Sequence, residues 1–72
     1  MSADNFLDII QHADGTFYVS YGFMSDDGPG RVVKQNLLTP LAAQEFVREY
    51  IDDVLEGVLE YGPYWYFNKE VQ

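Results

Sequence analysis

The sequence predicts an α+β fold in one small domain, residues 1–72: a small antiparallel sheet of 3–4 strands with one helix packed on one face. Three observations predict it. Two apolar segments flank an Asp-Gly pair, a later segment has helical periodicity, and the chain ends in a run of aromatic residues. The expected order is ββ(β)αβ, because an amphipathic helix beside short strands is typical of a two-layer domain.

The first two strands are expected at residues 6–11 and 17–23, since Asp14-Gly15 between apolar runs is typical of a hairpin turn. Two registers compete. A two-residue turn would carry Asp8 into the core. A three-residue loop with Gly15 in the left-handed region avoids burying that carboxylate and is preferred. Three side chains of the first strand then face the core: Leu7, Ile9 and Gln11. The opposite sheet face, called the outer face below, then carries Phe6 and Ile10 of the first strand and Tyr18 of the second.

Residues 25–30 form a loop by composition, and residues 31–35 are expected to form a third strand because Val32 and Val33 favour extended backbone. The last strand is expected at residues 58–67, with Pro63 at a sheet edge or a bulge. Alternation sends Tyr61, Trp65 and Phe67 to one face of it. It sends Tyr64 and Tyr66 to the other.

The segment 39–57 has the pattern of an amphipathic helix. Thr39 suits the N-cap, Pro40 the first helical position and Gly57 the C-terminal stop. At about 100° per residue, the apolar side chains share one half of the cylinder: Ala43, Phe46, Val47, Tyr50, Ile51, Val54 and Leu55. Four carboxylates share the other half and are called the acidic stripe: Glu45, Glu49, Asp52 and Glu56. Arg48 is the nearby basic residue.

Composition limits the classes of function. Twelve acidic and four basic residues give a net charge of −8, which disfavours direct binding to nucleic acid or to an anionic membrane. A hydrophobic fraction of 47% excludes an intrinsically disordered segment. The absence of cysteine excludes a disulfide framework and a thiolate zinc site. No apolar run reaches the roughly 18–20 residues that span a membrane.

Catalytic motifs are missing. His12 is the only histidine, no cysteine can pair with it, and Ser20 and Ser25 lie in no nucleophile motif. Residues 26–28 supply too few oxygen ligands for a calcium loop, and no phosphate-binding motif follows them. We therefore expect no enzyme, no cofactor and no metal.

The expected site binds a partner protein. Carboxylates with about 4.5–6 Å of axial rise between neighbours can engage Lys and Arg on a basic surface. Exposed aromatic side chains supply local anchoring. The expected partner-binding residues are Glu45, Glu49, Asp52, Glu56, Tyr64, Trp65 and Tyr66.

Three strings, Met1-Ser2-Ala3-Asp4-Asn5, Tyr21-Gly22-Phe23 and Glu60-Tyr61-Gly62, resemble those of small acidic phage- and prophage-encoded proteins of unknown function. The resemblance implies residence in the host cytoplasm and carries over no catalytic residue. By analogy with anti-CRISPR proteins, it implies a non-enzymatic inhibitor. Such an inhibitor docks on a basic surface of a host nucleic-acid-binding defence protein, for example a CRISPR effector. The alternative is a phage accessory or structural protein that self-associates through its aromatic sheet face or edge strand, with its acidic surface serving solubility.

Overall fold

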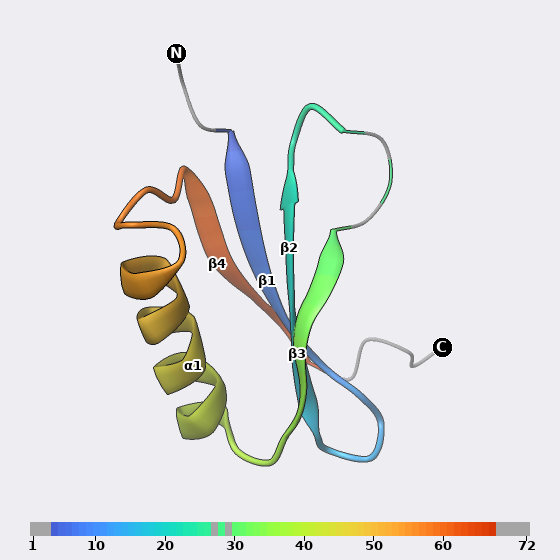
Figure 1. Cartoon of the computed structure of the whole chain (residues 1–72). Coiled ribbons are helices and arrows are strands. Elements are labelled where there is room, and N and C mark those ends of the chain that lie inside the picture. The colour runs from blue at the N-terminus through green and yellow to red at the C-terminus, as the bar shows by residue number, and fades with distance from the viewer. Residues whose placement is uncertain (1–3, 27, 29, 68–72) are drawn as a thin grey trace.

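The computed structural model describes residues 4–26, 28 and 30–67, and it shows a four-stranded sheet with one helix against one face (Figure 1). The α+β prediction is therefore confirmed. The elements follow in the order βββαβ: β1 (Asn5–Gln11), β2 (Phe17–Phe23), β3 (Arg31–Leu37), α1 (Pro40–Asp53) and β4 (Tyr61–Tyr66). Across the sheet the strands lie in the order β3-β2-β1-β4, so β3 and β4 form its edges.

The hairpin between β1 and β2 has the predicted three-residue loop. The strands are antiparallel, with Ile9 opposite Val19. His12 N–H donates to the Thr16 carbonyl at 2.9 Å, and Gly15 N–H donates to the His12 carbonyl at 3.0 Å. Gly15 has φ 95°, the left-handed conformation that glycine adopts without steric cost. The predicted register is confirmed, and it directs Leu7 and Ile9 into the core.

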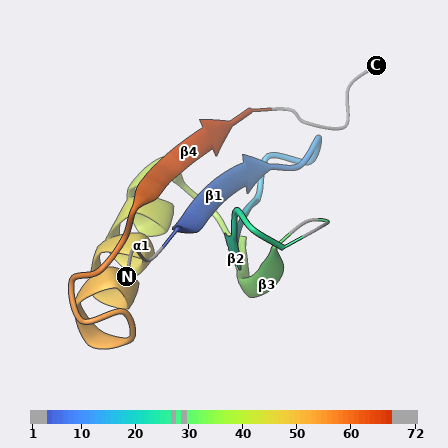
Figure 2. The same ribbon diagram turned by 90° about the horizontal axis from the view of Figure 1, so that it is seen from above.

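The prediction of a purely antiparallel sheet is wrong at one position. β4 lies beside β1 and runs parallel to it, as the two arrows in Figure 2 show. The reason is the crossover through α1. β1 and β3 are both antiparallel to β2, so they run in one direction. The helix then returns the chain past the sheet, and β4 starts again in that direction. The sheet is therefore mixed.

The predicted ends of the elements need correction. β3 is confirmed and continues two residues further than expected, to Leu37. β4 is shorter than expected, since residues 58–60 precede it as a loop. The alternation predicted for β4 is interrupted, because a register shift separates the Phe6–Tyr61 pair from the Asp8–Tyr64 pair. Tyr61 consequently pairs with Phe6 of the outer face, and its predicted grouping with Trp65 is not maintained.

Helix α1 begins where the sequence predicts and ends earlier. The Thr39 hydroxyl accepts a hydrogen bond from Ala42 N–H at 3.0 Å, which confirms the N-cap. The helix ends at Asp53, with Val54 as its C-cap. Gly57 N–H reaches back to the Ile51 carbonyl at 2.7 Å, and Gly57 has φ 83°. Gly57 therefore closes the turn after the helix and does not follow the last helical residue directly.

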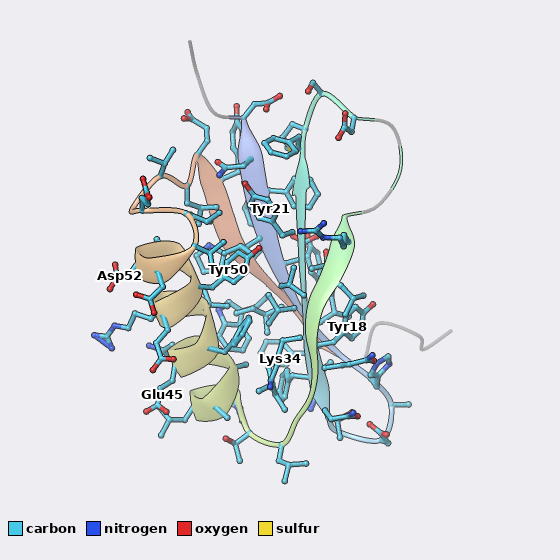
Figure 3. The ribbon with its side chains drawn as sticks, in the orientation of Figure 1. Tyr18, Tyr21, Lys34, Glu45, Tyr50 and Asp52 are labelled. Atoms are coloured by element: carbon cyan, nitrogen blue, oxygen red, sulfur yellow. The ribbon has the colours of Figure 1, made fainter. Side chains whose placement is uncertain are left out.

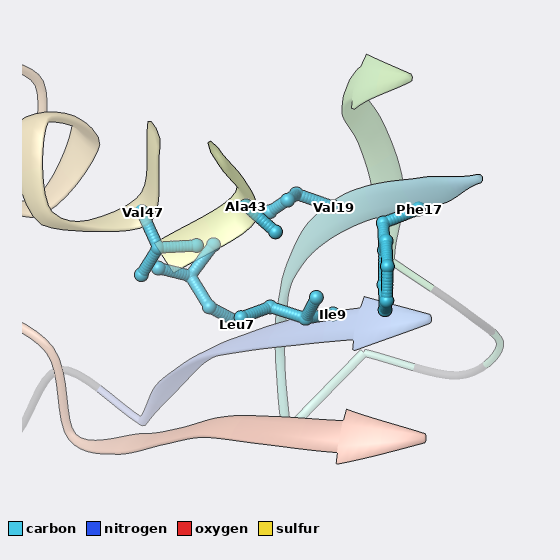
Figure 4. Close-up of a cluster of buried hydrophobic side chains, with 6 residues drawn as sticks. All are labelled: Leu7, Ile9, Phe17, Val19, Ala43 and Val47. Carbon is cyan, nitrogen blue, oxygen red and sulfur yellow. The ribbon is translucent and has the colours of Figure 1, made fainter. Parts of the chain in front are cut away.

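The core lies between α1 and the inner faces of β1 and β2 (Figure 4). Its buried side chains are Leu7, Ile9, Phe17, Val19, Ala43 and Val47. The predicted apolar face of the helix is confirmed for most members, because Phe46, Tyr50, Ile51 and Leu55 pack against this cluster. Val54 was placed there wrongly. Its side chain is 59% exposed, because the helix ends at Asp53 and the chain turns away.

Candidate functional site

Three members of the acidic stripe lie where the sequence places them. Glu45, Glu49 and Asp52 are exposed on α1. In Figure 3, Glu45 and Asp52 project from the side of the helix that faces away from the sheet, whereas Tyr50 lies between helix and sheet. The ring of Tyr50 lies 5.7 Å from that of Tyr21 on β2. The covered side of α1 thus serves packing, and its acidic side is left for solvent or a partner.

Glu56 is not part of this helical row. It lies beyond the last helical residue, Asp53, with φ 54° in the turn that Gly57 closes. The prediction that Glu56 extends the stripe by a further helical step is wrong, because the helix is 14 residues long and ends before it. Glu56 is still exposed, but its direction is set by the turn.

The three expected aromatic residues do not share a surface. Trp65 pairs with Ile9 and packs at the core face, where its ring meets Phe17 edge-on at 6.1 Å and stacks on Phe67 at 5.7 Å. Tyr64 and Tyr66 pair with Asp8 and Ile10, and both are exposed. Since Asp8 and Ile10 alternate with the core residues of β1, the two tyrosines lie on the outer face. Trp65 cannot bind a partner there together with them.

The expected partner-binding site therefore divides into two surfaces on opposite sides of the sheet. Helix α1 with its acidic stripe covers one sheet face, and no other described helix or strand covers the outer face (Figure 2). Tyr64 and Tyr66 belong to that outer face. A flat partner surface can contact the acidic stripe or the two tyrosines, but not both at once.

The outer face contains a hollow of about 490 Å³, called the outer hollow. Its described lining residues come from four strands and the loop before β3: Phe6, Asp8, Ile10, Tyr18, Ser20, Gly30, Val32 and Tyr66. Ile10 and Ser20 are only 8% and 6% exposed, so they form its floor. The remaining side chains surround the floor with three aromatic rings, the aliphatic Val32 and one carboxylate.

Two of the aromatic walls are held by their neighbours. The ring of Phe6 lies over Gly22, where an added Cβ would come within 2.8 Å of the ring and 2.9 Å of the Gly30 Cα. A residue without a side chain at this position lets the ring lie close on β2. Tyr18 stacks on His12, with ring centroids 4.6 Å apart and 27° between the planes. These contacts restrict the two rings before any ligand arrives.

The sequence predicts part of the outer hollow. The hairpin register places Phe6, Ile10 and Tyr18 on one face, and the hollow contains all three. Asp8 and Ser20 were not assigned to a site, although the same alternation puts them on that face. Val32 enters through its pairing with Ser20, across a β2–β3 ladder whose register is irregular. An irregular register of this kind leaves no period-2 signal in the sequence.

Neither a metal-binding cluster nor a membrane-spanning helix is found among the described residues. Among the described residues, no three His, Cys, Asp or Glu side chains gather closely enough to hold a metal ion. The part of the chain that the structure describes also contains no helix with the length and apolar character needed to cross a membrane. Comparison with models of known protein families, with curated proteins and with solved structures gives no match to this chain.

Proposed function

We propose that this protein is a non-enzymatic binding module that docks its outer sheet face on a basic surface of a partner protein. The observation that carries the proposal is the outer face itself. Aromatic side chains, among them Phe6, Tyr18 and Tyr66, line a hollow there, and no described element covers it. Exposed aromatic residues around a concave surface are typical of the centre of a protein–protein interface.

The acidic stripe has a different role in this proposal. Glu45 and Asp52 lie on the side of α1 away from the docking face. Glu49 follows Glu45 by one helical turn on the same side, so the three act through the electric field and make no contact. With a net charge of −8, the chain is attracted to a basic surface before it touches it. Charges outside an interface mainly change the rate of association and its dependence on salt. The stripe thus adds to the long-range attraction, and the outer face makes the contacts.

The resemblance to small acidic phage proteins suggests the class of partner. A nucleic-acid-binding defence protein in the cytoplasm of the host, such as a CRISPR effector, presents a basic surface to phosphates. A protein of this charge that occupies the surface excludes the nucleic acid from it. Inhibition then needs tight docking and no chemical step.

The test begins with affinity capture from a bacterial host lysate at about 50 mM and about 200 mM salt, with mass spectrometry of the bound proteins. Two variants are then compared on the captured partner. Tyr64→Ser with Tyr66→Ser is expected to raise the dissociation rate at least tenfold. Glu45→Gln, Glu49→Gln and Asp52→Asn together are expected to lower the association rate and flatten its salt dependence. Wild-type kinetics in both variants would refute the proposal.

A second candidate is self-association through the same outer face, as an accessory or structural phage protein. The aromatic surface, which no described element covers, favours it, because sheets with one apolar face commonly pack face to face. Against it, two copies of Asp8 would enter one interface, and both chains carry −8. Sedimentation equilibrium separates the two. A dimer that persists at low and moderate salt and is lost in the Tyr64→Ser, Tyr66→Ser variant supports self-association.

A further inference from the structure

We infer that β4 pairs with the β4 strand of a second copy of this chain, antiparallel and centred on Trp65. Among the described residues, β4 has a neighbouring strand, β1, on one side only, so its other side is an edge that a further strand can join. The pairing makes one continuous sheet from the sheets of two copies. The inference does not rest on the proposed function, because it concerns the edge of the sheet and not the outer face.

The opposite edge, β3, is poorly suited to an additional strand. Two register shifts interrupt its pairing with β2, and Asn36 in this strand has φ 64°. β3 also carries Arg31 and Lys34, and both are exposed. Irregular register and basic side chains are features by which edge strands avoid further pairing. β3 is therefore not the edge that we expect to be extended.

The second half of β4 is regular and uncharged. Its pairing with β1 continues without a shift from Tyr64 to Tyr66. No residue of β4 is charged, and its tyrosine and tryptophan residues favour extended backbone. Pro63 has no backbone N–H, so the part of the edge that can accept a strand begins at Tyr64. The two edges of the sheet thus differ in the properties that decide whether a strand is added.

Aromatic rings at this edge are incompletely covered. Tyr64 and Tyr66 are 40% and 38% exposed on the outer face. Towards the helix side, Phe67 is 57% exposed and stacks on Trp65, with ring centroids 5.7 Å apart. A strand beside β4 would lie against rings on both faces of the sheet. It would remove apolar surface from water on each face, which favours association.

The absence of charge on β4 favours a second copy as the added strand. A basic or acidic strand would find no opposite charge on β4 to pair with. Of the two edge strands of this chain, β4 is the uncharged one. In a pairing centred on Trp65, Tyr64 of each copy lies opposite Tyr66 of the other, and aromatic pairs across antiparallel strands are stabilising. The two-fold symmetry keeps both outer faces on one side of the joined sheet.

The net charge of −8 on each copy opposes association, but strand pairing keeps the carboxylates of the sheets apart. Asp8 on β1 is the one acidic residue within the four strands. In the joined sheet, the two copies of Asp8 are separated by three strand spacings. This distance of about 14 Å exceeds the screening length of about 8 Å at physiological salt. Edge pairing therefore avoids the close approach of Asp8 that face-to-face packing would bring.

Sedimentation equilibrium of the intact protein, from about 10 µM to about 1 mM in about 0.2 M salt, measures the association. We expect monomer at the low end and mostly dimer at the high end, because a short edge buries little surface and binds weakly. A mixture of ¹³C-labelled and unlabelled protein then locates the contact by NMR. Intermolecular nuclear Overhauser effects are expected between Tyr64 of one copy and Tyr66 of the other.

Two variants that differ only at position 66 test the register. Tyr64→Lys with Tyr66→Lys places lysine opposite lysine and is expected to weaken dimerisation at least tenfold, although the net charge falls from −8 to −6. Tyr64→Lys with Tyr66→Glu places lysine opposite glutamate and keeps the net charge at −8. This second variant is expected to dimerise at least fivefold more tightly than the first. Both positions are exposed, and each variant is first checked for native amide dispersion.

Tyr18→Lys is the control for packing through the outer face. Tyr18 lies on β2, an inner strand, and lines the outer hollow. The substitution is expected to change dimerisation less than twofold. A loss as large as that of Tyr64→Lys with Tyr66→Lys would mean that the copies pack face to face, and the inference would be wrong.

Three further results would overturn the inference: a monomer at every concentration, intermolecular contacts that do not include β4, or equal dimerisation of the two variants that differ at position 66. If the chain is monomeric and a captured partner protects the β4 amides from hydrogen exchange, a strand of the partner occupies the edge and not a second copy. None of these results decides the proposed function. That function is tested by kinetics on the captured partner, at concentrations where this chain is monomeric.

Discussion

At the scale of single residues, Asn5 connects two distant parts of the chain. Its buried amide nitrogen donates to the Tyr21 hydroxyl at 3.1 Å and to the Val58 carbonyl at 2.9 Å. Its amide oxygen accepts from Glu60 N–H at 2.8 Å. The start of β1 is thereby fixed to the loop that leads into β4. A single polar side chain thus makes three hydrogen bonds, two of them to that loop.

Asn5→Ala is therefore expected to lower the free energy of unfolding by about 1–3 kcal/mol, because it removes the two hydrogen bonds that the buried Asn5 side chain makes to the backbone at Val58 and Glu60. Urea unfolding followed by circular dichroism measures the loss. Gln44→Ala, at an exposed position of α1, is the control and is expected to stay within about 0.5 kcal/mol of wild type. Equal effects of the two substitutions would contradict the role given to Asn5.

Asp14 in the hairpin loop gives a dependence on pH. Its pKa is held below the ordinary value of 3.8, first by the backbone N–H of Thr16 and then by the Thr16 hydroxyl, which donate to Oδ1 at 2.9 and 2.7 Å. A lowered pKa in the folded state stabilises the fold above pH 3.8, and that stabilisation is lost as the pH falls through the folded pKa.

Asp14→Ala is accordingly expected to lower the melting temperature at neutral pH, and the difference from wild type is expected to shrink toward about pH 2. Thermal unfolding across this pH range measures the difference, and a carbon-13 titration of the carboxyl group measures the pKa directly. Glu45→Ala controls for the loss of a carboxylate elsewhere. A difference between wild type and Asp14→Ala that stays constant with pH would show that the charge of Asp14 has no part in it.

At the scale of elements, the capping of α1 can be tested separately from its packing. Thr39 is exposed, and its hydroxyl satisfies Ala42 N–H, one of the four amide groups that a helix leaves unpaired at its start. Thr39→Ala is expected to cost about 1 kcal/mol in chemical denaturation. Thr39→Ser keeps the hydroxyl and is expected to restore most of that loss. A serine variant as unstable as the alanine variant would assign the effect to backbone preference.

The elements also show which features of the fold a sequence can predict. The hairpin register follows from local chemistry, because burying Asp8 is costly and Gly15 accepts a positive φ. The parallel direction of β4 does not, since it depends on where α1 returns the chain. The end of α1 was placed too late, at Gly57, because the turn begins three residues earlier with apolar residues that fit a helix equally well.

The candidate site shows the same division. Alternation along β4 already separates Trp65 from Tyr64 and Tyr66, and the structure follows this alternation. The predicted site combined all three because it relied on their aromatic character as well as on alternation. The sequence also gives no signal that α1 and the two tyrosines lie on opposite sheet faces, since that depends on how the sheet is covered. The outer hollow could be predicted only with both the β1–β2 and the β2–β3 pairings known, because its lining residues come from all of these strands.

At the scale of the whole molecule, a thin shape and a high net charge both limit the stability of the fold. The Cα atoms extend over 39 × 26 × 14 Å, and in the described part of the chain one helix covers one face of one sheet. A one-sided core of this size contributes limited stability. The chain has twelve acidic and only four basic residues, so most of its charges are negative and repel one another across a small volume. Electrostatic repulsion consequently lowers the small net stability that remains after the entropy cost of folding.

Salt is therefore expected to stabilise the isolated protein. Raising sodium chloride from about 0.02 to about 0.2 M shortens the screening length from roughly 20 Å to less than 10 Å. Like charges at helical spacing, such as Glu45 with Glu49, each cost a few tenths of a kcal/mol. A total gain of about 0.5–1 kcal/mol would raise the melting temperature by about 2–8 °C. In the Glu45→Gln, Glu49→Gln, Asp52→Asn variant, the gain is expected to be clearly smaller. An equal gain in wild type and variant would mean that the stripe adds nothing to the repulsion, and a melting temperature that falls with salt would mean that attractive ion pairs dominate the fold.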